Sequence, residues 1–129
     1  MGTADRVLAY IKDQYGIEPE FLWAKFPGNA AFRHKDNRKW FAAMLWNTPK
    51  KKLGLVDEGA VDVLDLKCDP ILQGSLIDGR RYLPGYHMNK EHWITLVLDG
   101  SIPMEDICPL IDMSFMATAK RNKKQGAIR

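Results

Sequence analysis

The side chains best suited to binding chemistry gather in residues 84–93, which have the sequence PGYHMNKEHW. Within this stretch, Lys90 can hold a phosphate and Asn89 can hydrogen-bond to the edge of a base. Tyr86, His87 or Trp93 can stack on a base, because every base presents a flat π surface. The same residue types also suit the tip of a hairpin, where Asn89 accepts the backbone angles of a turn and Trp93 enters the core. The sequence leaves both interpretations open.

A second candidate site consists of cations on predicted turns and loops. Contacts to phosphate require exposed cations on protruding elements, and hairpin tips and loops supply that geometry. The residues are Lys35, Arg38, Lys39, Lys50, Lys51 and Lys52. A solvated rim that keeps an apolar sheet soluble and blunts its edge has the same composition. The position of these cations in the fold must therefore decide between the two interpretations.

The histidines and cysteines give little ground for a metal site or a reactive thiol. His87 and His92 lie five positions apart and a neighbouring carboxylate can join them, but no HExxH or paired CxxC spacing is present. The two cysteines sit far apart in apolar surroundings, which predicts reduced and buried thiols. We therefore expect no metal and no cofactor.

The motifs of the common catalytic sites are missing from the sequence. It contains no glycine-rich phosphate loop, no nucleophile elbow and no pair of carboxylates on one predicted helix face. A general base such as His87 would need a substrate pocket, which the sequence does not reveal. The sequence therefore predicts a binding module without catalytic residues rather than an enzyme.

Length and composition predict one globular domain over residues 1–129. The chain is 46% hydrophobic and 27% charged, and a chain of this size can bury a core without a disulfide or a metal. Its net charge of +3 permits anionic partners without requiring them. Charges interrupt the N-terminal segment, and no apolar run approaches the ~20 residues of a membrane span. These features predict a cytoplasmic protein without a membrane segment.

Hydrophobic periodicity predicts three helices and five strands. Helices are expected over 3–15, after Asp69-Pro70 and after Pro103. Strands are expected at 30–34, 39–46, 61–67, 86–88 and 92–98. The run 39–46 is apolar on both faces, which is typical of a covered interior strand. Because the strands follow one another in hairpins, the order α-βββ-α-ββ-α predicts an α+β fold with two layers: an antiparallel sheet of about five strands with helices on one face.

Local signals predict the ends of the helices. Thr3 is expected to cap the first helix and Asp69 the second, because their side-chain oxygens can accept from free backbone N–H groups. Pro109 is expected to kink or split the last helical segment. Asp112 or Ser114 can then cap the final helix.

Several strings of residues resemble the MmcQ/YjbR family of small bacterial proteins. The most specific is G-Y-H-M-N-K-x-x-W at 85–93, accompanied by Lys67-Cys68-Asp69-Pro70, Arg38-Lys39-Trp40-Phe41 and Ser114-Phe115. The resemblance covers almost the whole chain. It implies the two-layer fold shared with secretion chaperones, and a double-wing mode of DNA binding through two β-hairpins.

The leading hypothesis is a small non-enzymatic module that binds nucleic acid, DNA in particular, weakly and through phosphates. The expected contacts are Lys35, Arg38, Lys39, Lys50, Lys51, Lys52, His87, Asn89 and Lys90. The alternative is a module that binds a protein or a small ligand, chaperone-like or homodimeric, in a cleft beside the second hairpin. An apolar pocket there favours the alternative, whereas a basic, convex and pocket-free surface favours nucleic acid.

Overall fold

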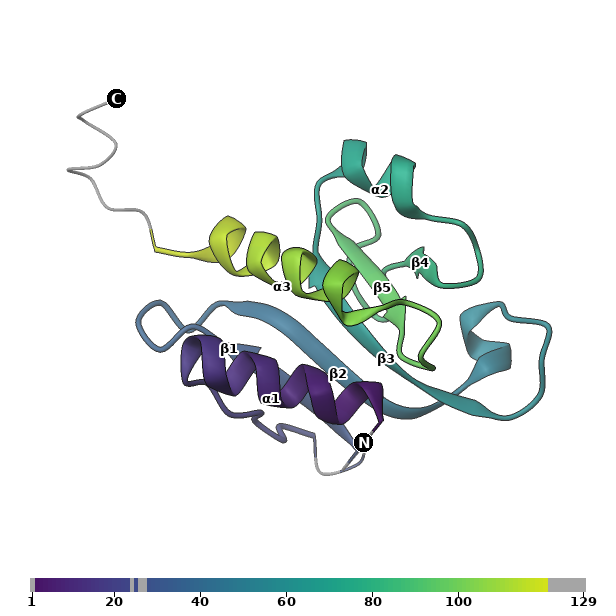
Figure 1. Ribbon diagram of the computed structural model, residues 1–129, viewed down its shortest axis with the longest axis horizontal. Coiled ribbons are helices and arrows are strands. Elements are labelled where there is room, and N and C mark those ends of the chain that lie inside the picture. Colours follow the sequence, from purple (N-terminus) through teal and green to yellow (C-terminus); the bar gives the residue numbers. More distant parts are fainter. Residues whose placement is uncertain (1, 24, 26–27, 121–129) are drawn as a thin grey trace.

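The computed structural model describes residues 2–23, 25 and 28–120 (Figure 1). The helices are α1 (Thr3–Tyr15), α2 (Pro70–Leu76) and α3 (Met104–Thr118), with a short 3₁₀ helix, η1 (Lys50–Leu53). The strands are β1 (Asn29–Arg33), β2 (Trp40–Pro49), β3 (Ala60–Lys67), β4 (Tyr82–Pro84) and β5 (Trp93–Val97). The predicted order of helices and strands is confirmed.

All five strands join one antiparallel sheet in the order β1-β2-β3-β5-β4. The edges are therefore β1 and β4, and β4 has only three residues and ends at Pro84. Outside the named strands, Glu20 forms an isolated bridge with Ala31 of β1. None of the described helices is long and apolar enough to cross a membrane.

One face of the sheet is covered by α1 and α3, which lie side by side (Figure 1). Their apolar residues pack against side chains of β1, β2, β3 and β5 that are fully buried, namely Phe32, Phe41, Met44, Leu64, Leu66, Ile94 and Leu96. Each large apolar side chain removed from water contributes about 1.5–3 kcal/mol, so this layer is the main source of stability. The predicted α+β fold with helices on one face is confirmed.

The opposite face of the sheet is covered by connections between strands, within the part of the chain that the structure describes. Its apolar residues are Ala43, Leu45, Val61, Val63, Leu83 and Val97, and against them pack Leu53, Leu55, Tyr86 and Met88. Interior strand β2 thus buries apolar side chains on both faces, as its sequence predicts.

One predicted helix cap is confirmed and one is wrong. Asp69 caps α2, because its carboxylate accepts a hydrogen bond of 3.0 Å from the backbone N–H of Leu72. Thr3 does not cap α1. Gly2 occupies the cap position and Thr3 is already helical, so no side chain accepts from the first turn.

The break predicted at Pro109 is wrong, because α3 runs without interruption through this residue. A proline removes the hydrogen bond to the carbonyl four residues earlier, here that of Glu105. Pro109 and Glu105 are both exposed, so water can satisfy the carbonyl that the proline leaves free.

Asp112 and Ser114 lie inside α3 and do not cap it, so that prediction is wrong as well. The buried hydroxyl of Ser114 bonds to backbone groups of β2 and β3. The carboxylate of Asp112 accepts hydrogen bonds from Tyr10 and Tyr15 of α1. Burial, followed by the bond to Asp112, raises the pKa of Tyr10 to about 12. Both polar residues join α3 to the rest of the fold instead of ending a helix.

The second hairpin exists, but the strand predicted at 86–88 is wrong. The partner of β5 is β4, in which Pro84 pairs with Ile94. Gly85 then passes so close to Trp93 that an added Cβ would lie 2.8 Å from its Cβ and carbonyl oxygen. The chain turns away after this contact, and residues 85–92 form a loop.

Candidate functional site

The strand register brings the two hairpin connections to the same end of the sheet. Arg33 pairs with Trp40 beside the β1–β2 turn, and Lys67 at the end of β3 pairs with Trp93 at the start of β5. The loop of residues 85–92 precedes Trp93 and therefore lies at this end as well. We call this the turn end of the sheet.

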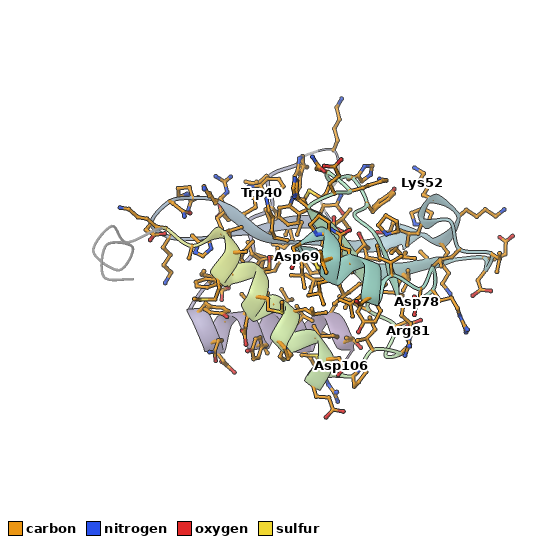
Figure 2. All side chains as sticks on the ribbon, turned by 90° about the horizontal axis from the view of Figure 1, so that it is seen from above. Trp40, Lys52, Asp69, Asp78, Arg81 and Asp106 are labelled. Carbon is orange, nitrogen blue, oxygen red and sulfur yellow. The ribbon has the colours of Figure 1, made fainter. Side chains whose placement is uncertain are left out.

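Residues Lys50–Lys52 lie at the opposite end, which we call the η1 end. Strand β2 runs through ten residues between the turn and η1, and a strand of that length spans ~30 Å. Figure 2 shows Lys52 on the side of Asp78 and Arg81, away from Trp40. The structure thus does not bring the six predicted cations into one site.

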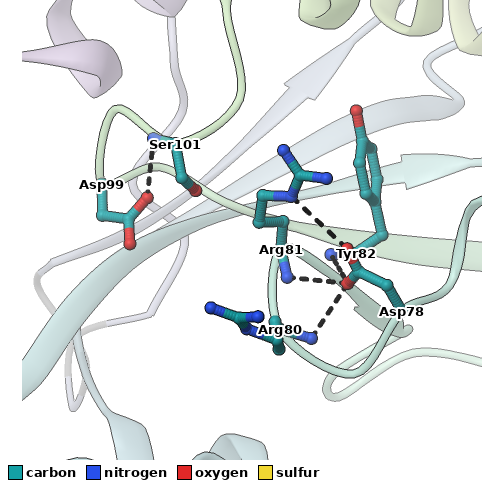
Figure 3. A network of polar contacts seen from close by, with 6 residues as sticks. All are labelled: Asp78, Arg80, Arg81, Tyr82, Asp99 and Ser101. Atoms are coloured by element: carbon teal, nitrogen blue, oxygen red, sulfur yellow. Dashed lines mark hydrogen bonds and ion pairs between the residues drawn. The ribbon is translucent and has the colours of Figure 1, made fainter.

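The η1 end is mixed in charge. A groove of about 1000 Å³ there has among its lining residues Lys50, Arg80 and Arg81 but also Asp57, Asp78 and Asp99. Asp78 accepts backbone N–H bonds from Tyr82, Arg80 and Arg81 (Figure 3). These bonds, that of Tyr82 first, hold the pKa of its carboxyl well below the usual range. A phosphate in this groove would meet several carboxylates, which oppose its binding.

A shallow hollow at the turn end combines cations with indole rings. Its lining residues are Arg38, Lys39, Trp40, Lys67, Trp93, Ala117 and Thr118, and its volume is about 410 Å³. The ammonium of Lys67 lies 5.6 Å from the centroid of the Trp93 ring, within the range of a cation–π interaction. None of these lining residues carries a carboxylate, so the side chains of the hollow attract anions.

The β1–β2 turn that forms one wall of the hollow is fixed by Asn37. Its side-chain oxygen accepts from the N–H of Lys39 at 2.8 Å, and its amide nitrogen donates to the carbonyl of Thr118 at 2.9 Å. The left-handed backbone falls on Arg38, with φ 63°, and its guanidinium pairs with Glu20 at 3.0 Å. Part of the charge of Arg38 is therefore already balanced.

Lys35, the other cation predicted on this turn, serves the helix beside it. Its ammonium lies next to Gly16 at the C-terminus of α1, 3.3 Å from where a Cβ would be. A cation at that position is stabilised by the negative end of the helix dipole. Lys35 is not among the residues that line the hollow.

The loop of residues 85–92 uses two of its predicted contact residues to hold its own shape. Asn89 accepts the N–H of Glu91 at 2.9 Å through its side-chain oxygen. The ammonium of Lys90 donates to the carbonyl of Gly85 at 3.1 Å. The side chains of Asn89 and Lys90 are nevertheless exposed, so a partner can still reach them.

A second hollow lies on the loop-covered face of the sheet. Its volume is about 290 Å³, and it is lined by Trp23, Asn29, Trp40, Ala43, Leu45, Asp65, His87 and Met88. The rings of Trp23 and Trp40 meet edge to face, with centroids 5.5 Å apart. His87 is exposed, has a left-handed backbone (φ 62°) and packs its ring on Tyr86 at 4.0 Å. This is an apolar cavity beside the second hairpin.

Of the residues that line this cavity, only His87 belongs to the set predicted from the sequence, and the acidic residue Asp65 was not predicted. It is 0% exposed, and one carboxylate oxygen accepts from the hydroxyl of Thr95. The other oxygen, Oδ2, has no hydrogen-bond partner among the described residues. Burial raises the pKa of Asp65 to about 7, although the bond from Thr95 and the charge of Lys90 act to lower it. Its only signal in the sequence is a carboxylate placed among the apolar residues of strand 61–67.

The described part of the chain contains no cluster of metal-binding side chains. No group of three or more His, Cys, Asp or Glu side chains comes together there in a way that could hold an ion. Both cysteines are free thiols, with Cys68 buried and Cys108 partly buried. Burial raises the pKa of each thiol, which disfavours the reactive thiolate.

The YjbR family model matches residues 12–117. The chain belongs to the YjbR family. A relative from Bacillus subtilis (strain 168), uncharacterized protein YyaQ, is 42% identical over 118 residues, which are 92% of this chain and 99% of that protein. The resemblance noted from the G-Y-H-M-N-K-x-x-W string is thereby confirmed.

Two solved structures share the fold of this YjbR-family chain. The crystal structure of a protein from Pseudomonas syringae is 43% identical and superposes with a TM-score of 0.84, covering 89% of this chain and 97% of that one. A crystal structure from Deinococcus radiodurans superposes with a TM-score of 0.69 at 23% identity, covering 94% of this chain and 81% of that one. The latter likeness concerns the fold alone. Function must be inferred from the residues of this chain.

Proposed function

We propose that this YjbR-family protein is a small, non-enzymatic module that binds nucleic acid weakly through the hollow at the turn end. The observation that supports this most is the lining of the hollow, with three cations, two indole rings and no carboxylate. Cations attract phosphates and indoles stack on bases, so their combination suits a flexible single strand. The approach of both hairpins to this end is compatible with the double-wing mode that the family resemblance implies.

The expected affinity follows from the number of contacts. Stacking contributes about 1–3 kcal/mol per base, and non-specific complexes have dissociation constants of roughly 10⁻⁴ to 10⁻⁶ M at physiological salt. Each phosphate contact to a single strand adds about −0.7 to the slope of log affinity against log salt. The three cations of the hollow, of which Arg38 is partly balanced by Glu20, therefore predict a slope no steeper than about −2.

The proposed interface keeps part of the set predicted from the sequence. Arg38 and Lys39 line the hollow, and Lys67 joins them from β3. His87, Asn89 and Lys90 lie exposed on the neighbouring loop and can extend the contact along a strand. The other predicted cations, Lys35 and the three lysines of η1, stand outside it.

A titration with a single-stranded thymidine oligonucleotide tests the proposal. The double variant K39A/K67A is expected to lower the affinity about tenfold at low salt and to reduce the salt slope to about −0.7. The matched control K51A/K52A removes the same charge at the η1 end and is expected to change the affinity less than about twofold. Fluorescence anisotropy measures both.

Equal losses in the two double variants would show that binding follows net charge, and the proposed interface would then be wrong. The same conclusion holds if no amide resonance of residues 37–40, 67 or 93 shifts when the oligonucleotide is added. Circular dichroism spectra of both variants establish that each is folded before the affinities are compared.

The alternative function is the binding of a protein or a small ligand, and the apolar cavity beside the second hairpin supports it. The protein partner in this alternative can also be a second copy of the chain. Exposed apolar side chains supply a reason to test it, namely Phe21, Leu22, Val56, Ile71, Met113 and Met116. They belong to different segments of the chain, and Met113 and Met116 share the exposed side of α3. Sedimentation velocity over a range of concentrations detects a homodimer, and loss of the dimer in M113S/M116S would favour this alternative.

A further inference from the structure

We propose that the cavity on the loop-covered face binds a small, flat nitrogen heterocycle that donates paired N–H groups to the carboxylate of Asp65. This site is distinct from the hollow at the turn end, although Trp40 lines both. The inference does not depend on nucleic-acid binding there.

The unpaired oxygen of Asp65 is the first argument. Strand β3 lies between β2 and β5, and Asp65 pairs with Ala43 on one side and with Thr95 on the other. The carboxyl group is thus held in the middle of the sheet with one oxygen, Oδ2, unsatisfied. A buried acceptor without a partner destabilises the fold, and an apolar side chain there would be less costly. A donor supplied by a ligand removes that cost.

The walls of the cavity limit the shape of the ligand. A volume of about 290 Å³ is at the lower end of the range for small-molecule sites and fits a molecule of one or two rings. Trp23, Trp40, Leu45 and Met88 supply apolar and aromatic surface, on which a flat ring packs well. Asn29 adds a second polar side chain to the lining.

The carboxyl group of Asp65 determines which polar groups the ligand presents. Oδ2 of Asp65 is free to accept one N–H, and Oδ1, which accepts from Thr95, has a second lone pair for another. A carboxylate binds two parallel N–H donors better than one, and it repels anions. Because burial raises the pKa of Asp65 to about 7, the carboxyl group is close to its titration point at neutral pH. Donation of two N–H groups then favours the ionised form, because hydrogen bonds to a carboxylate stabilise its charge.

A chain of hydrogen bonds links Asp65 to the loop of residues 85–92, which covers this face of the sheet. The hydroxyl of Thr95 donates to Asp65, and the same oxygen accepts from the N–H of Tyr86 at 2.8 Å. Tyr86 is followed by His87 and Met88, which form one wall of the cavity. Occupation of Asp65 is therefore expected to change the environment of the Tyr86 amide without any contact between Tyr86 and the ligand.

The test uses 2-aminobenzimidazole, a flat two-ring probe with paired N–H donors, and benzofuran, which has the same ring size and no N–H. In ¹H–¹⁵N spectra of the full chain, 2-aminobenzimidazole is expected to cause saturable shifts of the amides of Ala43, Asp65, Tyr86 and Met88. Benzofuran is expected to cause none at equal concentration.

Two variants with one carboxylate removed form the matched comparison. D65N keeps the shape of the side chain and is expected to weaken the binding of 2-aminobenzimidazole at least about tenfold. E91Q removes an exposed carboxylate from the covering loop and is expected to change affinity less than about twofold. If D65N does not fold, W23L replaces a wall residue outside the helices and strands and is expected to weaken binding about fivefold.

The proposal is overturned if 2-aminobenzimidazole shifts none of these amides at millimolar concentration. It is overturned as well if benzofuran binds equally, or if D65N and E91Q have the same effect. A thymidine oligonucleotide with one central guanine, whose base edge has paired N–H groups, identifies the source of the heterocycle. If the protein prefers this oligonucleotide and D65N abolishes the preference, the heterocycle is a base within a nucleic-acid strand. If both oligonucleotides bind equally and 2-aminobenzimidazole still binds, the heterocycle is a free small molecule.

Discussion

The two faces of the sheet are built in different ways. The face under α1 and α3 consists of large apolar side chains that are completely buried, such as Phe32 and Leu64. The face under the strand connections also buries apolar residues, but it contains a cavity and the carboxyl group of Asp65. Helices cover the first face and loops cover the second.

This contrast indicates where the small fold can accommodate a costly polar group. The helix-covered face supplies most of the apolar burial, so the other face can tolerate an unsatisfied oxygen and a void. Loops can also change in sequence and conformation without disturbing the packing of helices on strands. The proposed heterocycle site thus lies on the face opposite to the one that supplies most of the apolar burial.

The largest expected effect compares two leucines on opposite faces. Leu66→Ala, under the helices, is expected to lower the free energy of unfolding by about 4 kcal/mol, because close packing surrounds the new void. Leu45→Ala borders the existing cavity, so fewer contacts are lost and about 2 kcal/mol is expected. Urea unfolding at constant m-value measures both. Equal losses would contradict the distinction between the faces.

The second prediction concerns pH and the carboxyl group of Asp65. Its pKa is about 7 in the folded protein, against an ordinary value of 3.8. Between these values the folded state holds a proton that the unfolded chain has released, so the stability that Asp65 contributes falls as pH rises from about 4 to about 7. The fall is on the order of 3 kcal/mol, and D65N is expected to remove it.

Denaturant unfolding of wild type and D65N at several pH values measures this difference. Burial lowers the pKa of His34, so this residue also makes the stability depend on pH. That contribution is common to both proteins and cancels in the comparison. Parallel stability profiles for the two proteins would show that folding does not raise the pKa of Asp65.

The smallest effects compare two glycines. Gly85→Ala is expected to destabilise by about 1–3 kcal/mol, because the new methyl group would meet Trp93 at 2.8 Å. Gly74→Ala in α2 meets nothing within 4 Å and is expected to stabilise by about 0.5–1 kcal/mol through helix propensity. Thermal unfolding gives the sign of each. A stabilising Gly85→Ala would mean that the covering loop is not tightly fitted to β5.

Signals that act within a few residues allowed much of the fold to be predicted from the sequence. Asp69-Pro70 starts a helix because the cap and the fixed proline angle operate locally. The two-sided apolar run of β2 predicted an interior strand, because burial on both faces leaves no polar alternation. These signals gave the order of elements and the two layers.

The wrong predictions concern residues whose structure is determined by contacts with distant parts of the chain. Tyr86 and Met88 have the pattern of a strand, but the pairing with β5 belongs to residues 82–84 and the contact of Gly85 with Trp93 ends it. Ser114 has the chemistry of a helix cap, but it bonds to backbone groups of two strands. Local pattern does not contain this information.

Only some residues of the candidate site could be proposed from the sequence, because their grouping also depends on contacts between distant residues. Cations could be identified by type, but only the strand register shows that Lys39 and Lys67 share one end while Lys50–Lys52 lie at the other. Asp65 is one acidic residue among many in the sequence. Its importance depends on the strand at the middle of the sheet and on the loop that covers it.

The edges of the sheet have a consequence for the behaviour of the protein at high concentration. Strand β4 offers only three residues and ends in a proline without an N–H group, and on β1 the backbone of Ala31 is already paired with Glu20. An added strand needs a long row of free donors and acceptors, which neither edge provides. Growth of fibres by edge-to-edge pairing is therefore expected to be slow for this chain, even when it is concentrated.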